Sequence, residues 1–335
     1  MDTSTVPLLF GERQTVCSSF SGNWFVTCER SRCILQDLNG RKFDLPASIN
    51  CVDGLAVSED GRFVIDVGYG PFFPKREDYP VIAYAADTGA KLWELATLPA
   101  IGAAQVTPRN IVLLPCSGAV LLIRLKTGEI VSRLTTRYSS PSCVEASATP
   151  DGRLVVVTEK DMTINRYRHP CEAQRVTAFD AAKGEVVWSI LSGEQAMEQL
   201  RCVDNQTVAA WRGNEIVVFD VLNPSSTAIS LPPGHAGGQC AFQMDADTRS
   251  LWFLDNRATL WFRAGDLGVW EPMECEHSAG IPDVPAAENR VYALITGDRR
   301  LIVSVPPGWS PPPRATTRVR PKMPREAPRV RPSVA

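Results

Sequence analysis

Short runs of β-branched and aromatic residues alternate with turns rich in Gly, Asp, Asn and Pro along most of the chain. Runs of this length and composition are typical of β-strands. No long segment has the 3.6-residue apolar spacing of an amphipathic helix. The pattern therefore predicts an all-β protein built from many short strands.

Two kinds of turn recur in a fixed order. The first kind is clearest at Ser58–Val64 and Thr149–Val155, where Asp-Gly tolerates the positive φ of a tight hairpin. Its weaker copies are Thr107–Val112, Val203–Val208, Asp247–Trp252 and Ala287–Tyr292. The second kind is found at Asp87–Trp93, Lys126–Val131 and Ala182–Trp188, with a shorter relative at Leu38–Phe43. Two hairpins in this order describe a four-stranded unit.

Copies of the first turn lie roughly 40–55 residues apart, which is the period of a propeller blade. We predict a single β-propeller of about seven four-stranded blades in residues 1–305, with six and eight as the alternative counts. The expected blades cover residues 12–45, 50–97, 101–135, 142–192, 195–232, 237–274 and 281–305. The last is short, so we expect an N-terminal strand at Val6–Phe10 to complete it and close the ring.

The hairpins at Asp87–Trp93 and Ala182–Trp188 resemble the D-x-x-T-G-x-x-x-W repeat of quinoprotein-like (PQQ-type) propellers. The Asp-Gly-Arg turns are similar to those of WD40 blades. This resemblance implies the fold, and by analogy an accessory subunit of a larger assembly. Redox quinoproteins of that family often carry adjacent bonded cysteines and use acidic calcium ligands. The chain has no adjacent cysteines, and no cofactor site carries over, so we expect no cofactor.

Charge is distributed unevenly along the chain. The net charge is −2, but Pro306–Ala335 holds seven basic residues and one acid, which leaves −8 on residues 1–305. Nucleic acid is therefore an unlikely ligand for the propeller. Because neither an export signal nor an apolar run of membrane-spanning length is found, we expect a cytoplasmic protein with no membrane span. In that setting the ten cysteines are expected to be reduced and largely buried, as the apolar surroundings of Cys28, Cys116, Cys202 and Cys240 indicate.

Two insertions interrupt blades at the same position, between the second and third strands. They are Gly68–Pro80 and Lys160–Cys171, and both combine aromatic residues with Arg, which are enriched in interface hot spots. Ordinary loop variation is the alternative interpretation. The candidate protein-binding residues are Tyr69, Phe72, Phe73, Tyr79, Arg166, Tyr167 and Arg168.

The segment 306–335 contains nine prolines, and we expect it to be a disordered or polyproline II tail. Pro311–Arg314 resembles an SH3-type ligand, and the basic side chains of Arg314, Arg318 and Arg320 suit an acidic partner. A solvated tail without a dedicated partner is the alternative.

Catalytic motifs are missing from the sequence. There is no G-x-S-x-G elbow, Walker loop or H-E-x-x-H, and a zinc site from Cys171 and Cys275 with their neighbouring histidines is disfavoured. We expect a non-catalytic protein-interaction scaffold or accessory subunit that binds an unidentified protein partner through loops on one propeller face. A hydrolase or lactonase-type enzyme with a channel site is the alternative, and a small-ligand sensor is the second.

Deleting Pro306–Ala335 is expected to leave the thermal unfolding midpoint unchanged, because a proline-rich basic tail adds nothing to the blade cores. Differential scanning calorimetry of the truncated and full chains tests this. A fall of several degrees would show that the tail packs on the ring.

Overall fold

The computed structural model describes residues 3–4, 13–20, 23–29, 32–37, 41–47, 49, 54–67, 80–96, 104–137, 144–160, 174–193, 197–232, 241–254, 260–273, 292–295 and 301–304. Every regular element in these ranges is a β-strand, as the alternating pattern predicts. Within the same ranges no helix has the length and apolarity needed to cross a membrane. The tail 306–335 lies outside the described residues.

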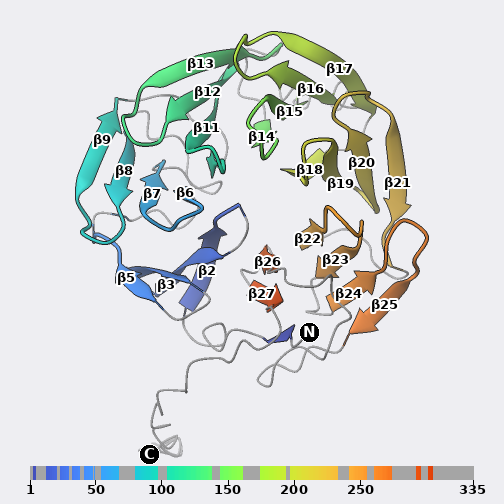
Figure 1. Cartoon of the computed structure of the whole chain (residues 1–335), viewed down its shortest axis with the longest axis horizontal. Helices are drawn as coiled ribbons and strands as arrows, with labels where there is room; N and C mark the ends of the chain where they lie inside the picture. The colour runs from blue at the N-terminus through green and yellow to red at the C-terminus, as the bar shows by residue number, and fades with distance from the viewer. Residues whose placement is uncertain are drawn as a thin grey trace, which may run out of the picture.

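Six antiparallel sheets of four strands are arranged around a central axis (Figure 1). Blades 1 and 2 contain β2 (Arg13–Ser18), β3 (Trp24–Glu29), β4 (Arg32–Asp37), β5 (Lys42–Asp44), β6 (Leu55–Val57), β7 (Phe63–Asp66), β8 (Val81–Ala85) and β9 (Lys91–Leu95). Blades 3 and 4 contain β10 (Gln105–Val106), β11 (Ile111–Cys116), β12 (Ala119–Arg124), β13 (Ile130–Thr135), β14 (Val144–Ala148), β15 (Leu154–Lys160), β16 (Gln174–Asp180) and β17 (Val186–Gly193). Blades 5 and 6 contain β18 (Met197–Cys202), β19 (Thr207–Arg212), β20 (Glu215–Asp220), β21 (Ser226–Ser230), β22 (Ala241–Met244), β23 (Leu251–Leu254), β24 (Leu260–Arg263) and β25 (Trp270–Met273).

A three-stranded sheet closes the ring. It contains β26 (Tyr292–Ile295), β27 (Leu301–Ser304) and β1 (Thr3–Ser4), in the order β1-β27-β26. β26 contacts β2 of blade 1 and β22 of blade 6, so this sheet lies between the first and last blades. β1 pairs antiparallel with β27, with Thr3 opposite Ser304.

This sheet corrects two details of the sequence prediction. The described chain has six four-stranded blades, not about seven, because the C-terminal segment supplies only β26 and β27 to the closing sheet. A strand from the N-terminus does join them, but it is Thr3–Ser4. The predicted strand Val6–Phe10 lies outside the described residues.

The first kind of turn has the backbone conformation that the sequence predicts. Four blades have a positive φ in this turn: at the fourth residue in Gly61 (67°), Asn110 (59°) and Gly152 (68°), and at the third residue of Asp247–Trp252 in Arg249 (58°). The Arg249 backbone N–H donates to the Asp245 carbonyl at 3.0 Å, and its guanidinium donates to Thr207 Oγ1 at 2.9 Å. These bonds hold a residue without intrinsic preference for this conformation.

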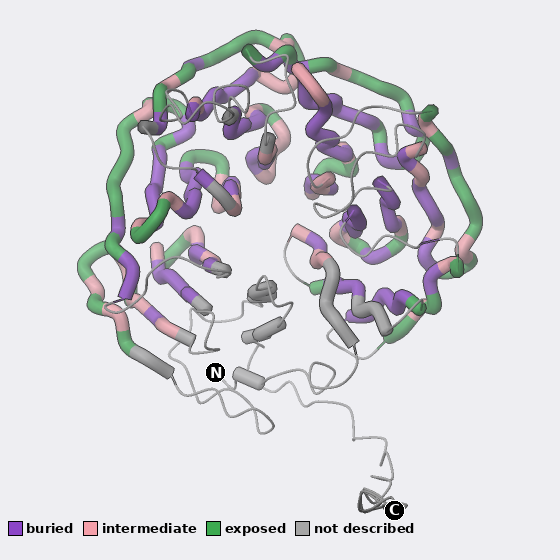
Figure 2. Tube along the Cα trace, turned by 180° about the vertical axis from the view of Figure 1, so that it is seen from behind, coloured by how far each residue is buried: buried purple, intermediate pink, exposed green. Residues whose placement is uncertain are grey.

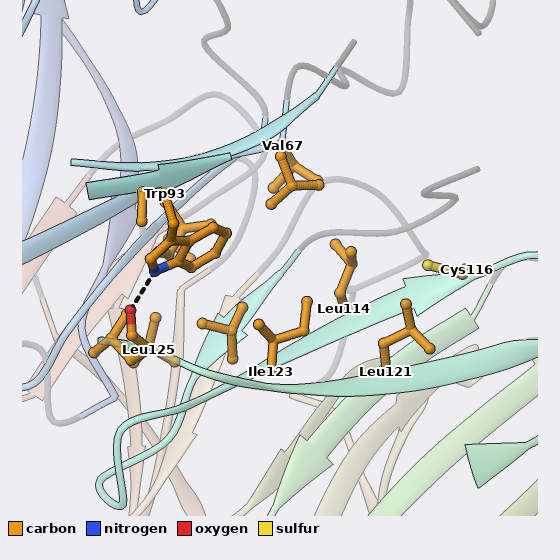
Figure 3. Packing of buried hydrophobic residues seen from close by; sticks show 13 residues of the cluster. Val67, Trp93, Leu114, Cys116, Leu121, Ile123 and Leu125 are labelled. Atoms are coloured by element: carbon orange, nitrogen blue, oxygen red, sulfur yellow. Dashed lines mark hydrogen bonds between the residues drawn. The ribbon is translucent and has the colours of Figure 1, made fainter. Parts of the chain in front are cut away.

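Apolar side chains fill the spaces between neighbouring blades, so most strands are buried while the outer strands remain exposed (Figure 2). Figure 3 shows one such cluster between blades 2 and 3, which includes Val67, Trp93, Leu114 and Ile123. The Trp93 indole Nε1–H crosses to the next blade and donates to the Leu125 carbonyl at 2.6 Å. In blade 4, the Trp188 indole donates in the same way to the Val221 carbonyl of blade 5 at 2.5 Å.

The prediction of reduced cysteines is confirmed at Cys17, Cys116 and Cys202 and is wrong at Cys33. Cys116 and Cys202 are buried free thiols, and burial raises the pKa of each to about 12. Cys33, in contrast, is disulfide-bonded. The hairpin between β3 and β4 brings the backbone of a second cysteine, Cys28, directly opposite it. Cys240 lies outside the described residues.

Substituting Gly128 by Ala should be more destabilising than substituting Gly184 by Ala. Both glycines occupy the same position in the second kind of turn, and their φ angles are 73° and 72°. A Cβ at Gly128 would lie 2.9 Å from the Trp93 ring, whereas the nearest atom at Gly184 is 3.6 Å away. The left-handed conformation costs an alanine about 1–2 kcal/mol, and overpacking against a rigid ring adds about 1–3 kcal/mol.

Urea unfolding of the two variants measures the difference. Equal losses of free energy of unfolding would show that the Trp93 ring can move aside for a methyl group at position 128. That result would contradict tight packing between blades 2 and 3.

Candidate protein-interaction face

Both insertions begin and end at the same place in their blades, as predicted. The first connects β7 to β8 and the second connects β15 to β16, which are the second and third strands of blades 2 and 4. β27 is likewise the second strand of the closing sheet, and the chain continues from it into the tail. Strand direction alternates in each sheet, so the ends of β7, β15 and β27 point to one face of the ring. We call this the insertion face.

The predicted binding residues themselves lie outside the described residues. This holds for Tyr69, Phe72, Phe73 and Tyr79 of the first insertion, for Arg166, Tyr167 and Arg168 of the second, and for Arg314, Arg318 and Arg320 of the tail. The structure fixes where their segments leave the propeller. Their role in binding stays a prediction.

Buried polar side chains anchor the base of the second insertion. Glu159, next to the last residue of β15, is 2% exposed and accepts hydrogen bonds from the Arg137 backbone N–H at 2.8 Å and from Thr177 Oγ1 at 3.1 Å. Gln174, the first residue of β16, accepts from the Met197 backbone N–H of blade 5 at 2.8 Å. The insertion therefore starts and ends on strands that are fixed to their neighbours.

Three polar side chains from successive innermost strands lie close together at the centre of the ring. Glu145 on β14 accepts a hydrogen bond from the Leu200 backbone N–H at 2.7 Å, and Arg201 on β18 donates to Gln243 Oε1 on β22 at 3.2 Å. Burial lowers the pKa of Arg201, and the negative charge of Glu145 opposes that shift. Gln199, two residues before Arg201, has a φ of 55° and lies at a bulge in β18. The cluster links blades 4, 5 and 6.

The described blades also have an apolar rim that was not predicted from the sequence. Exposed aliphatic side chains recur at the second kind of turn and at the start of the outer strand in five successive blades: Leu92, Ile130, Val131, Val186, Val187, Leu222, Leu267 and Val269. Leu267 is 98% exposed and Val269 is 74% exposed. The sequence feature that could have indicated this rim is an apolar pair directly before the tryptophan of the second kind of turn, as in Val186-Val187-Trp188. Exposed apolar residues grouped in this way mark candidate contact surfaces.

Metal ligands do not gather in the described part of the chain, where no group of three His, Cys, Asp or Glu side chains is suited to a metal ion. The cysteines and histidines of the disfavoured zinc site lie outside it.

Comparisons with known proteins agree with the propeller fold. A family model described as outer membrane protein assembly factor BamB matches residues 77–226. Among solved structures, the chain is similar to the Cps50 (Swd1) β-propeller domain of Myceliophteria thermophila, with 15% identity, a TM-score of 0.57, and coverage of 90% of this chain and 99% of that one. BamB from Moraxella catarrhalis has 13% identity and a TM-score of 0.45, with coverage of 87% and 95%. A search of curated proteins gives no match.

These findings confirm the resemblance to PQQ-type and WD40-like repeats. The chain is a β-propeller whose repeats resemble this class. At such low identity, the similarity to solved structures establishes the fold alone.

Replacing Glu145 by Ala should lower the free energy of unfolding by about 1–3 kcal/mol, because it leaves the Leu200 N–H without its acceptor and Arg201 without a nearby counter-charge. Glu145→Gln keeps an acceptor oxygen, so we expect a smaller loss. Glu129→Ala is the control, since it removes only an exposed ion pair with Arg124. Equal thermal midpoints for Glu145→Ala and Glu129→Ala would contradict the structural role of the cluster.

Proposed function

We propose that this propeller is a non-catalytic protein-interaction scaffold or accessory subunit, which binds its partner through the segments on the insertion face. The observation that carries the proposal is the common position of β7, β15 and β27 in their sheets. It brings the starts of two aromatic and Arg-containing insertions, and of the basic tail, to one face. A partner on that face would meet all three segments at once.

Two further observations support this proposal. The family model that matches residues 77–226 describes an assembly factor, which favours an accessory role in an assembly. The strands at the base of the second insertion are fixed by Glu159 and Gln174, so the loop rises from a rigid support. Binding residues on loops held by a rigid scaffold are a common arrangement in proteins.

A channel-site hydrolase or lactonase is the alternative, and a small-ligand sensor is the second. The cluster of Glu145, Arg201 and Gln243 at the ring centre is the observation that favours a channel ligand. The Glu145 carboxylate and the Arg201 guanidinium, however, already form hydrogen bonds with groups of neighbouring blades. A screen of esters, lactones and small anions against the full chain tests both alternatives.

Replacing each insertion by a short Gly-Ser linker is expected to preserve folding, because the blade cores lie between strands that remain. Partner capture from native lysate should fall at least tenfold when both insertions are replaced. The partner is quantified by mass spectrometry after affinity capture.

Leu267→Ser with Val269→Ser is the matched control. Both residues are exposed and lie at the apolar rim, away from the insertions. Full capture by the linker variant, with loss of capture by the rim variant, would place the interface on the outer rim and contradict the proposed face.

A further inference from the structure

The outermost strand of blade 4 has an open edge. This strand, β17, comes last in the sheet order β14-β15-β16-β17 and lies on the outer circumference of the ring (Figure 1). It pairs antiparallel with β16 on one side, with register shifts only near its ends, so that Trp188–Leu191 is regularly paired. Within the described part of the chain no strand pairs with its other side. The unpaired backbone N–H and C=O groups of such an edge are a template for a further strand.

β17 lacks the features that usually protect an open edge. Edge strands are commonly kept short, or they carry a charged residue or a proline. Four of the other outer strands, β5, β9, β13 and β25, have such residues: Lys42, Asp44, Lys91, Glu94, Arg133, Glu271 and Pro272. β21 is uncharged but has only five residues, and its one large apolar side chain, Ile229, is buried. β17 has eight residues, more than any other outer strand described, and contains neither a charge nor a proline.

The side chains of β17 are divided between its two faces. Trp188 is buried in the apolar cluster between blades 4 and 5, and Ile190 packs against the same cluster. Because successive side chains of a strand point to opposite faces, Val187, Ser189 and Leu191 lie on the other face. Val187 is 47% exposed and Leu191 is 62% exposed. Two exposed apolar side chains therefore flank the small Ser189 at equal spacing.

A strand with this pattern is complementary to itself. When two identical strands pair antiparallel about a two-fold axis, one residue lies opposite its own copy, and the residues two places before and after it lie opposite each other. With Ser189 on the axis, Val187 of each copy lies opposite Leu191 of the other, so that exposed apolar side chains meet at two places. Because β17 holds no charged residue, no like charges are opposed along the strand. The edge thus matches a second copy of itself in side-chain chemistry and in backbone pairing.

We propose that two copies of this chain form a dimer by pairing antiparallel through β17, with Ser189 on the two-fold axis. The two blade 4 sheets then join edge to edge. The occupant of the edge is a second copy, because β17 itself supplies the uncharged strand with apolar residues at the matching positions. Antiparallel pairing reverses one ring relative to the other, so the two insertion faces point in opposite directions. The dimer goes beyond the proposed scaffold role and does not depend on it.

Sedimentation velocity of the full chain tests for the dimer without any binding partner. Concentrations from about 1 to 100 μM cover the dissociation constants that suit a small, reversible interface. A reducing buffer excludes intermolecular disulfides. We expect a sedimentation coefficient that rises with concentration from the monomer value to the dimer value and falls again on dilution. A monomer at every concentration would overturn the proposal.

Two matched charge variants test the register. Val187→Glu with Leu191→Glu places like charges opposite each other at two places, and should weaken dimerisation at least tenfold. Val187→Lys with Leu191→Glu changes the same two positions but places opposite charges there, and should dimerise at least tenfold more tightly than the first variant. Val131→Glu, on the outer strand β13, is the control and should leave the equilibrium unchanged. Equal dimerisation of the two double variants, or loss of the dimer in Val131→Glu, would contradict pairing through β17.

A cross-link tests the centre of the interface. Ser189→Cys places a thiol opposite its own copy, at a Cα separation that a disulfide spans. Mild oxidation should link two copies, and peptide mapping should join position 189 to position 189. Val131→Cys is the control and should give no link between two copies of position 131. Links from position 189 only to other positions would contradict the register. Thermal midpoints of dilute protein check that each variant is folded, which we expect because the substituted side chains are exposed.

Discussion

Packing between adjacent blades is the constraint on which this structure depends. A single four-stranded sheet cannot bury both of its faces, and here each apolar face is covered by the next blade. Trp93 and Trp188 strengthen this contact, because each indole fills space beside the following blade and donates its N–H to a carbonyl there. The glycine at position 128 allows the Trp93 ring to approach the turn of the next blade. Each such contact therefore fixes the position of one blade against the next.

A ring built from such contacts must also join its first and last blades. β1 pairs with β27, and β26 contacts both β2 and β22, so the two ends of the folded chain meet in one sheet. This arrangement removes open faces from blades 1 and 6. It also fixes the direction in which the chain leaves β27, and hence the face from which the tail begins. Closure and the location of the proposed interaction face follow from the same strand order.

Local features of the fold were predictable from the sequence, because they depend on residues close together in the chain. The Asp-Gly turns at Gly61 and Gly152 have the predicted positive φ, and the insertions lie between the predicted strands. The closing strand was misplaced, since the apolar run Val6–Phe10 gives a stronger strand signal than the polar pair Thr3–Ser4. That short pairing depends on backbone hydrogen bonds to a distant strand, which side-chain patterns do not encode.

Features that join different blades were not predictable from one sequence. The cluster of Glu145, Arg201 and Gln243 draws one side chain from each of three innermost strands, with no fixed spacing between them. The disulfide of Cys33 was not predicted, because cysteines of a cytoplasmic protein are expected to be reduced. The predicted binding residues lie outside the described residues, so their role continues to depend on experiment.

Lysine cross-linking of the chain with its captured partner tests the central claim most directly. Lys160 ends β15 on the insertion face, whereas Lys126 and Lys183 belong to turns of the second kind at the rim. The account predicts that mass spectrometry will find partner cross-links at Lys160 and at Lys75 of the first insertion. Cross-links confined to Lys126 and Lys183 would contradict it.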